Sequence, residues 1–386
     1  MRPAGRPKVM HVVVAGDVGG AERLLAGLAS RPEYSGADHA IALMTPNPRL
    51  RETFRAAGLS VRDRGPVREN PLAYLWRSFG PSDFAWLVGV LADEAASLVH
   101  IHTVGAHILA VRAAHRLALP VVRTEHGIRH FHDPSCLLFR RWALDAADRV
   151  VAVSEYVARR VAAAAPYVAG RLQTIRNGVD AAYFHPVTAP GDGPLRLCVV
   201  SRLEPWKRID LALRALARVP SVRLDIVGDG SAAGKLRALV DRLNLGDRVS
   251  FLGYRSDPRE VIAKSDAAIS CSRDEPLGLS VLEALAMQRP VIAFAGGGIP
   301  ELVQDGQTGW LVRDHSIGAL AARITEASAS RERAAALGVN ARRFVEQHCR
   351  IEDMCAAYGR VYADVLENRR GESASRPEPS RKVAPT

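Results

Sequence analysis

The sequence predicts an α/β protein built from two Rossmann-like domains, and three observations lead to this fold class. Short apolar runs rich in Val and Ile alternate with longer amphipathic stretches, which is typical of parallel sheets buried on both faces by helices. The alternation restarts after a run of turn-forming residues at 186–194, where we place the domain linker. The length of 386 residues is ample for two hydrophobic cores.

Residues 1–185 are expected to form the N-terminal domain. Its first apolar run leads directly into a glycine-rich turn, and no run in the chain approaches the roughly 18 apolar residues that cross a bilayer. We therefore interpret this run as a strand rather than as a signal peptide or a membrane span. The strands of the domain are predicted at residues 9–15, 40–44, 97–102, 120–124 and 149–153.

Residues 195–350 are expected to form a second domain of the same kind. Beyond Ile317 the pattern predicts only helices. Residues 369–386 are mainly Ser, Pro, Arg and Glu with almost nothing to bury, so we predict a disordered tail there. The strands of this domain are predicted at residues 195–201, 224–227, 249–252, 267–271 and 291–294.

Composition and charge narrow the class of protein. With 48% hydrophobic and 24% charged residues, the chain is neither a disordered protein nor a disulfide framework. A net charge of +11 usually suggests nucleic acid or anionic membrane, but only five of the 52 basic residues are lysines. We attribute that arginine bias to genome composition and expect no nucleic-acid partner. Five cysteines without a C-x-x-C pair predict reduced thiols and a cytoplasmic location.

The strongest chemical signal is a loop-to-helix segment at residues 274–286. A strand is expected to end near Ser272, the loop then carries Glu275, and a helix begins near Gly278 with Glu283 inside it. Free backbone amides at a helix start bind an anionic group, and glycine lets the ligand approach the backbone. Carboxylates on either side of the anion accept hydrogen bonds from hydroxyls. A ligand with hydroxyl-rich groups on both sides of a phosphate is a sugar nucleotide.

A second segment, residues 201–208, follows the first strand of the second domain. Arg202 and Lys207 lie five positions apart in one strand-to-helix loop, where a guanidinium fork and an ammonium neutralise a diphosphate. Ligands in such sheets bind at the carboxyl ends of strands. Gly228 and Gly230 follow another strand and are placed at the same edge.

In order and in context, these segments resemble glycosyltransferase family 4, and the resemblance spans most of residues 9–350. It rests on Arg202 with Lys207, on Glu275 and Glu283 separated by seven residues, and on three further motifs. Those motifs are Gly19-Gly20-Ala21-Glu22-Arg23, Asn177-Gly178-Val179-Asp180, and Pro300-Glu301-Leu302-Val303 with Gly306-x-x-Gly309. The resemblance implies the GT-B architecture, in which two Rossmann-like domains face each other across a cleft.

The resemblance also implies a role for each candidate residue. Arg202 and Lys207 would hold the diphosphate, Glu283 the ribose, and Glu275 the donor sugar. Gly19 and Gly20 would approach the phosphates from the opposite domain, and a final helix at 351–368 would pack back onto that domain. The remaining candidates are His126 beside the transferred sugar, Gly228 and Gly230 on the donor side, and the backbone of Leu277, Gly278, Leu279 and Ser280.

The implied reaction is metal-independent transfer with retention. No two aspartates are separated by a single residue, so the D-x-D metal clamp of other glycosyltransferases is missing, and we expect neither a metal nor a cofactor. Fixed cations and a helix N-terminus would stabilise the leaving nucleoside diphosphate. A donor phosphate oxygen would take the acceptor proton, which leaves Glu275 an orienting and electrostatic role.

Two further groups of residues have competing interpretations. His100, His102 and His107, or His126, His130 and His132, suggest a metal, but their spacing matches no closed zinc pattern and we predict none. Aromatic and basic residues interleave near residues 68–87, where a helix either packs into the N-terminal domain or contacts anionic lipid on the cytosolic face of the inner membrane. They are Tyr74, Trp76, Phe79, Phe84 and Trp86, with Arg49, Arg51, Arg55, Arg62, Arg64, Arg68 and Arg77.

The sequence thus predicts an enzyme that moves a hexose from a UDP- or GDP-sugar to a glycan or lipid-linked saccharide, in the synthesis of cell-surface polysaccharide or glycolipid. Two rival enzymes share the two-domain plan, a sugar-nucleotide epimerase and a phosphorylase. The epimerase would lack the ordered set of two basic and two acidic residues, and the phosphorylase would require inorganic phosphate. A polyanion-binding protein is the non-enzymatic alternative, and steep salt dependence of nucleic-acid binding would favour it.

Overall fold

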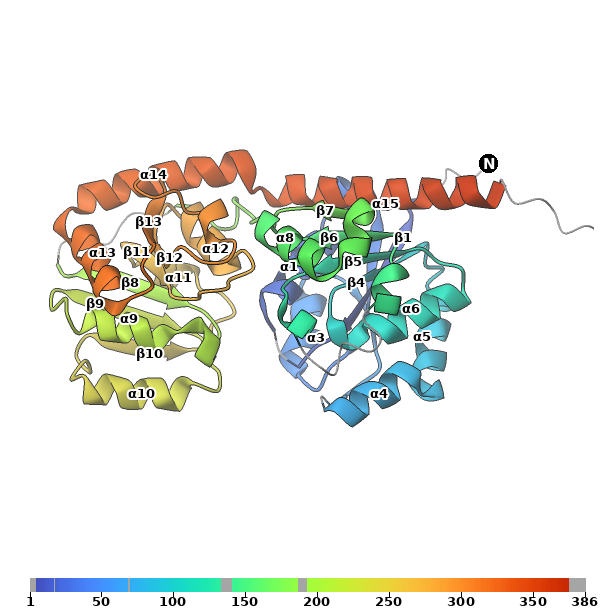
Figure 1. Ribbon diagram of the computed structural model, residues 1–386, viewed down its shortest axis with the longest axis horizontal. Helices are drawn as coiled ribbons and strands as arrows, with labels where there is room; N and C mark the ends of the chain where they lie inside the picture. The colour runs from blue at the N-terminus through green and yellow to red at the C-terminus, as the bar shows by residue number, and fades with distance from the viewer. Residues whose placement is uncertain (1–4, 17, 69, 133–140, 187–192, 375–386) are drawn as a thin grey trace, which may run out of the picture.

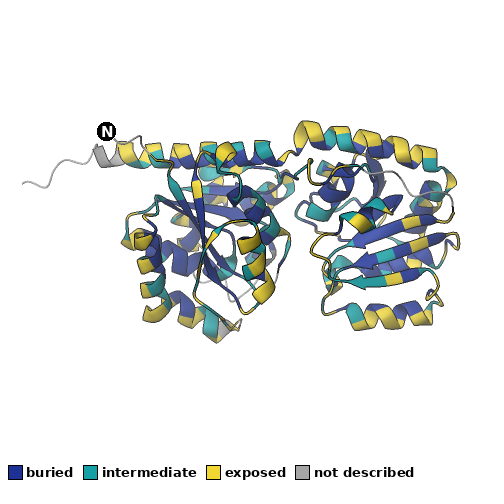
Figure 2. Ribbon diagram, turned by 180° about the vertical axis from the view of Figure 1, so that it is seen from behind, coloured by how far each residue is buried: buried dark blue, intermediate teal, exposed yellow. Residues whose placement is uncertain are grey.

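The computed structural model describes residues 5–16, 18–68, 70–132, 141–186 and 193–374. It has two lobes, each built on a parallel sheet covered by helices, and it confirms the predicted α/β fold class (Figure 1). The inner strands of both sheets are largely buried while the helices keep one exposed face, as the alternating sequence pattern requires (Figure 2).

The N-terminal lobe contains a sheet of seven parallel strands within the described residues. The first strand, β1, lies inside the sheet and pairs with β2 on one side and β4 on the other, so that the chain crosses over at this strand. Ligands bind beside such a crossover, at the carboxyl ends of the strands. In spatial order the strands are β3 (Ser60–Asp63), β2 (Asp38–Met44), β1 (Lys8–Val14), β4 (Leu98–Ile101), β5 (Val121–Glu125), β6 (Arg149–Ala152) and β7 (Leu172–Thr174).

Helices cover both faces of this sheet. Asn47, Asn70 and Ser154 accept backbone hydrogen bonds at the starts of three of them, as N-cap residues do. The helices are α1 (Gly20–Ala29), α2 (Pro32–Ser35), α3 (Pro48–Ala56), α4 (Pro71–Phe79), α5 (Pro81–Asp93), α6 (His107–Arg116) and α8 (Glu155–Ala164), with short 3₁₀ turns at Val104–Ala106, Arg129–His132 and Pro166–Arg171.

The C-terminal lobe repeats the plan with six parallel strands among its described residues. The strands, in spatial order, are β10 (Val249–Gly253), β9 (Val222–Val227), β8 (Leu195–Val200), β11 (Ala267–Ser270), β12 (Val291–Phe294) and β13 (Gly309–Val312). The helices are α9 (Ile209–Leu216), α10 (Ala233–Arg242), α11 (Arg259–Ala263), α12 (Leu279–Ala286), α13 (Ile317–Ala329) and α14 (Arg331–His348), with 3₁₀ turns at Pro205–Lys207 and Ile299–Glu301.

Three strands escape sequence prediction for local reasons. β7 is only three residues long, and all three are at least partly exposed. β3 lies at the edge of its sheet and its four residues are all at least partly exposed, so it has no apolar run. β13 is fully buried but begins at a glycine and is only four residues long, GWLV. Short strands of this kind form because neighbouring strands pair with them, and their own sequence shows little strand preference.

The chain crosses between the lobes at two adjacent points. Val179 and Phe184 already pack in a core cluster of the C-terminal lobe, so the first crossing lies before the predicted linker at 186–194, of which residues 187–192 lie outside the described part. The second crossing brings Arg350 beside Val179 in a parallel bridge. A Cβ on Gly178 would lie 2.5 Å from the Arg350 carbonyl oxygen, which explains the glycine of the Asn-Gly-Val-Asp motif.

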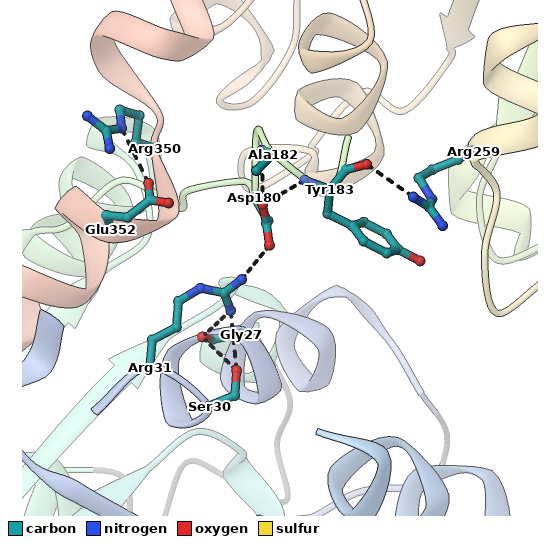
Figure 3. Close-up of polar contacts among 9 residues, drawn as sticks. All are labelled: Gly27, Ser30, Arg31, Asp180, Ala182, Tyr183, Arg259, Arg350 and Glu352. Atoms are coloured by element: carbon teal, nitrogen blue, oxygen red, sulfur yellow. Dashed lines mark hydrogen bonds and ion pairs between the residues drawn. The ribbon is translucent and has the colours of Figure 1, made fainter. Parts of the chain in front are cut away.

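Asp180 of the same motif ties the first crossing to the N-terminal lobe (Figure 3). Its carboxylate accepts hydrogen bonds from the backbone of Ala182 and Tyr183, at 3.0 and 2.8 Å, and forms an ion pair with Arg31. Arg31 also donates to the Gly27 carbonyl oxygen at the end of α1 (2.9 Å). The motif therefore has a structural function where the chain crosses between the lobes.

The last helix, α15 (Ile351–Ala374), leaves the C-terminal lobe and lies along the N-terminal lobe (Figure 1). Its buried face, which includes Met354, Tyr358 and Tyr362, packs with Val9 and Leu98 of the sheet. The helix continues six residues beyond the predicted end at 368, so the predicted tail at 369–386 is wrong for residues 369–374. Residues 375–386 lie outside the described part.

Candidate active site

A cleft of about 430 Å³ lies between the lobes. It is lined by residues that follow the carboxyl ends of β1, β5 and β6 in one lobe and of β8, β9 and β11 in the other. All of the candidate residues from the sequence line it except Gly230: Gly19, Gly20, His126, Arg202, Lys207, Gly228, Glu275, Leu277, Gly278, Leu279, Ser280 and Glu283. Its volume lies within the usual range for small-molecule sites.

The start of helix α12 forms the floor of the cleft. Gly278 precedes the helix with a φ of +99°, a conformation that favours glycine, and it sits tightly among Ile299, Val281 and Glu275. The first amides of α12, at Leu279 and Ser280, have no acceptor within the helix and lie at the positive end of its dipole. An anionic group therefore fits at this point.

The N-terminus of α1, in the other lobe, approaches the same place. A Cβ on Gly20 would lie 3.7 Å from the Cβ of Leu279, so the two helix starts meet across the cleft. Gly19 donates its amide to Glu22 at 2.8 Å, and a Cβ on Gly19 would crowd that carboxylate at 2.9 Å. The N-termini of two helices, one from each lobe, thus lie beside each other in the cleft.

Two basic side chains add fixed positive charge. Lys207 Nζ donates to Glu275 Oε2 at 2.6 Å and lies 4.2 Å from the centre of the Trp206 ring. Arg202 is exposed in the same loop, and the structure shows no ion pair for it within the described ranges. A diphosphate in the cleft would therefore contact an unpaired Arg202 guanidinium. It would also contact the Lys207 ammonium, which Glu275 already holds in position.

Glu283 is a buried carboxyl group that faces the cleft without a full set of partners. One oxygen, Oε2, has no hydrogen-bond partner among the described residues, while Oε1 lies 3.7 Å from Arg23 Nη1. Burial raises the pKa of Glu283 to about 7, against the opposing effect of Arg23. A buried acceptor without a donor is costly in an empty protein, and ligand hydroxyls would satisfy it.

His126 follows β5 and is half-buried at the wall of the cleft. Its Nε2 atom lies 3.1 Å from Nδ1 of His102, behind it in the lobe. Burial lowers the pKa of His126 to about 4, although the adjacent Glu125 opposes this effect. The imidazole is therefore neutral at pH 7 and has one nitrogen left for a ligand.

Gly228 and Gly230 have different functions in the structure. Gly228 lines the cleft with a φ of +136°, and a Cβ there would overlap the Ser201 carbonyl oxygen, so it lets the loops after β8 and β9 pack together. Gly230 lies outside the cleft lining and packs against the Leu203 carbonyl oxygen, where a Cβ would approach to 2.6 Å. We assign Gly230 to the shape of the loop.

Further residues line the cleft that the sequence analysis had not assigned to it. Arg49 lies over the Tyr254 ring of the other lobe at 4.9 Å, and Arg23 donates to the Arg255 carbonyl oxygen at 3.3 Å. Asn177 and Trp206 also line the cleft. Arg23 and Asn177 belong to motifs named above but had been given no role in the cleft, and Arg49 had no distinguishing pattern. The fold brings all three to the cleft.

A glycine triplet, Gly296–Gly298, holds the loop that carries Glu275. The Gly298 amide donates to the Glu275 carbonyl oxygen at 2.8 Å, and a Cβ on any of the three glycines would lie between 2.0 and 2.3 Å from a backbone oxygen of residues 273–276. The run of three glycines was the available signal in the sequence. The three glycines position Glu275 through contacts with the backbone of its loop.

Gly297→Ala is expected to lower the turnover number at least tenfold, because its Cβ would displace Glu275 (2.1 Å from the carbonyl oxygen). Gly306→Ala is the matched control. Both glycines have a positive φ, +63° and +72°, so each substitution costs about 1–2 kcal/mol of backbone strain, but nothing lies within 4 Å of a Cβ on Gly306. Steady-state kinetics and thermal unfolding of both variants test this. Equal turnover numbers for the two variants would contradict it.

The Pro300-Glu301-Leu302-Val303 motif contributes to the contact between the lobes. Glu301 accepts hydrogen bonds from the backbone amides of Glu155 and Tyr156, at 3.0 and 2.7 Å, at the start of α8. Ser154 donates to the Pro276 carbonyl oxygen across the same boundary at 2.6 Å. The loop of Glu275 is thus fixed from the opposite lobe as well.

The fold and the cleft together define the class of protein. Two Rossmann-like lobes with a cleft between them at the carboxyl ends of both sheets form the GT-B architecture of glycosyltransferases. The N-terminal lobe matches the family model "Glycosyltransferase Family 4" over residues 18–183, and the C-terminal lobe matches "Glycosyl transferases group 1" over residues 182–344. The chain belongs to glycosyltransferase family 4 and is a glycosyltransferase.

Relatives and solved structures agree with this membership. A D-inositol 3-phosphate glycosyltransferase of Mycobacterium marinum is 30% identical over 325 residues, which are 74% of this chain and 69% of the relative. The enzyme of that name from Mycolicibacterium smegmatis is 31% identical over 316 residues, 72% of each chain. Anabaena Alr3699/HepE, solved with UDP and glucose, has a TM-score of 0.77 at 23% identity, and sucrose-phosphate synthase from Thermosynechococcus elongatus has 0.78 at 23%. Both alignments cover 94% of this chain and 100% of the other.

Proposed function

We propose that this glycosyltransferase transfers a hexose from a UDP- or GDP-sugar, with retention, to a glycan or lipid-linked saccharide in the synthesis of cell-surface polysaccharide or glycolipid. The observation that carries the donor assignment is the free, buried Oε2 of Glu283 beside the start of α12. It offers an acceptor for ribose hydroxyls next to a position for phosphate. UDP is the first nucleotide to test, because HepE was solved with UDP and with UDP-glucose.

In this proposal the diphosphate lies between the starts of α12 and α1. Lys207 and Arg202 supply the charge that a metal supplies elsewhere, so transfer needs no metal ion. The bond between the anomeric carbon and the phosphate oxygen breaks, the acceptor oxygen bonds to the same face, and its proton moves to a phosphate oxygen of the leaving group. Glu275 stabilises positive charge on the sugar, and no protein nucleophile takes part.

The acceptor is proposed at the N-terminal side of the cleft. The relatives named as D-inositol 3-phosphate glycosyltransferases favour a phosphorylated polyol as a second candidate. Arg49 supports this candidate, since its exposed guanidinium lines the cleft from the N-terminal lobe and is able to bind a phosphate. Both acceptor classes belong in the same assay.

The function is tested by binding first and transfer second. Of UDP, GDP and ADP, at least one is expected to raise the melting temperature, with about 2.7 kcal/mol of added stability at 100 times its dissociation constant. Release of the diphosphate from the matching sugar nucleotide should then depend on an added acceptor, persist in EDTA, and give a product of unchanged anomeric configuration by NMR. No response to any of the three nucleotides would contradict the proposal. Loss of activity in EDTA would overturn its metal-independent part.

We also propose that helix α4 contacts an anionic membrane surface. None of the helices described is long and apolar enough to cross a membrane, so the contact would be peripheral. Leu72, Leu75, Trp76 and Phe79 have the i, i+3, i+4, i+7 spacing of one helix face, and they are 41–80% exposed. Phe84 and Trp86, by contrast, pack against the core. Amphipathic helices with such a face insert into the lipid headgroup region.

Arginine contributes less to this surface than the sequence suggested. Arg51, Arg62 and Arg64 are paired with acidic residues, while Arg68 beside α4 is exposed. We therefore expect the protein to float with anionic liposomes at low salt, and the double substitution Trp76→Ser and Phe79→Ser to lower the bound fraction at least fivefold. Trp142→Ser, which removes an exposed tryptophan elsewhere, is the control. A wild-type protein that does not float would end the proposal.

A further inference from the structure

A row of histidines crosses the N-terminal lobe behind the cleft. Four adjacent strands each contribute one imidazole: His39 in β2, His11 in β1, His102 just after β4 and His126 just after β5. The first three are at most 9% exposed, and α15 covers this face of the sheet. Only His126 reaches the cleft.

The ring nitrogens of these four residues form a continuous series of hydrogen bonds. His126 Nε2 lies 3.1 Å from His102 Nδ1, and His102 Nε2 lies 2.9 Å from His11 Nδ1. His11 Nε2 then lies 2.8 Å from His39 Nδ1, and His39 Nε2 lies 2.7 Å from the hydroxyl of Ser35 at the end of α2. Every inner imidazole uses both of its nitrogens.

Each imidazole in the series is neutral. Burial holds the pKa of His11 and His102 well below 6.5, and it lowers the pKa of His39 and of His126 to about 4. A neutral imidazole donates through one nitrogen and accepts through the other. The tautomers of all four rings are therefore coupled, and the whole series points in one of two directions.

Ser35 decides the direction. Its hydroxyl oxygen lies 2.7 Å from His39 Nε2, whereas the carbonyl oxygens of Arg31 and Ala37 lie 3.5 and 3.4 Å away. The hydroxyl proton makes its strong hydrogen bond only with the imidazole. With Ser35 as the donor to His39, each ring donates to the next, and the last proton lies on Nδ1 of His126.

We propose that Ser35, His39, His11 and His102 are positioning residues that fix His126 as the tautomer with its proton on Nδ1, so that it donates a hydrogen bond into the cleft. The catalytic consequence rests on the proposed function: His126 would bind a sugar oxygen and would be unable to act as a base toward it through that nitrogen. The tautomer itself is a property of the empty protein.

A metal ion is the competing interpretation of these histidines. Ligand atoms of His11, His100 and His102 lie within 4.8 Å of one another, and this group lies behind the cleft among the residues described. His100, however, already contacts Tyr362 and Thr124, each at 2.8 Å, and the other two belong to the series. Among the described side chains His107 is not part of this group, and His130 lies against Glu125 at 3.2 Å.

Nitrogen-15 NMR of histidine-labelled protein without ligand tests the proposal, because protonated and non-protonated ring nitrogens give separate signals. His126→Asn identifies the signals of His126. The proton is expected on Nδ1 of His126 in the wild type, and on both nitrogens in fast exchange in Ser35→Ala. Ser30→Ala, which removes a nearby hydroxyl outside the series, should match the wild type. His39→Gln keeps an amide near Ser35 but removes the contact with His11, and it should behave as Ser35→Ala does.

Kinetics supply the second measurement. Ser35→Ala and His39→Gln should lower kcat by about five- to tenfold, the effect of one hydrogen bond, with KM for the sugar nucleotide unchanged within twofold. A proton on Nε2 of wild-type His126, an unchanged tautomer in both variants, or a stoichiometric metal in the purified protein would overturn the proposal. An enzyme that shows the Nδ1 tautomer but binds no nucleotide would leave the series intact and contradict the proposed function instead.

Discussion

Glu275→Gln is expected to reduce sugar transfer at least about 100-fold while it changes the affinity for the nucleoside diphosphate less than threefold. Glu275 is 9% exposed in the cleft, and its carboxylate accepts the hydrogen bond of Lys207 at 2.6 Å. In the proposed reaction, positive charge develops on the sugar as the diphosphate leaves, and a fixed carboxylate stabilises it. The glutamine keeps the shape of the side chain and loses that charge. Lys207, freed from its ion pair, remains available to the phosphate.

A neighbouring residue provides the control for this substitution. Asp274 is exposed in the same loop, outside the cleft lining, and contacts the hydroxyl of Tyr156 at 3.1 Å. Asp274→Asn makes the same change of charge one position away and should retain transfer within about twofold. Calorimetric titration with UDP and initial rates on all three proteins separate binding from chemistry. A fully active Glu275→Gln enzyme would contradict the assigned role, as would one that loses binding alone.

Glu283 is expected to make donor binding depend on pH below about 7. Its pKa is about 7 in the empty protein, because burial disfavours the charged carboxylate. Ribose hydroxyls donate to that carboxylate and favour the ionised form, so binding releases a proton at lower pH. The dissociation constant for UDP-glucose should rise up to tenfold for each pH unit below 7 and remain constant above it. The diphosphate diester has no group that titrates in this range. Glu283→Gln should bind weakly at every pH.

The same carboxyl group should affect stability with the opposite sign. Its pKa rises from 4.5 in the unfolded chain to about 7 in the folded one, so its contribution to stability is complete below about pH 4.5 and is lost as the pH rises through 7. At pH 8, Glu283→Gln should therefore unfold at a higher temperature than the wild type, with a gain of up to about 3 kcal/mol that disappears below about pH 4.5.

Glu94 is the matched comparison for this effect. It is also buried, but its hydrogen bond to Lys8 and its pairing with Arg62 lower its pKa. Glu94→Gln should therefore destabilise the protein at pH 8 and leave nucleotide binding unchanged. If Glu283→Gln also destabilised the empty protein at pH 8, the account of an unpaired carboxylate would be wrong.

The central parts of the fold and the cleft were predictable because they depend on local sequence patterns. Buried parallel strands produce runs of Val and Ile, and turns that line the cleft carry glycine at fixed offsets from those strands. Glu275 stands in such a turn, Glu283 in the helix that follows it, and Lys207 in a strand-to-helix loop. Their positions relative to the strand ends were therefore sufficient to place them at one edge of the sheet.

The missed features depend on contacts between distant segments. Arg23 and Arg49 become cleft residues only because α1 and α3 face the other lobe. His11 and His39 lie in apolar strands without any motif, and their connection to His126 exists only once four strands pair in register. Residues 369–374 looked polar enough for a tail, yet α15 extends through them. No local pattern contains this information.

A crystal structure with UDP bound tests the central claim most directly, namely that the cleft between the lobes is the donor site. We predict the diphosphate against the first amides of α12, within reach of Lys207 and Arg202, and the ribose hydroxyls within hydrogen-bond distance of Glu283. The phosphates should also lie beside Gly20 of the opposite lobe. UDP bound elsewhere, or bound in the cleft with its ribose away from Glu283, would contradict the account.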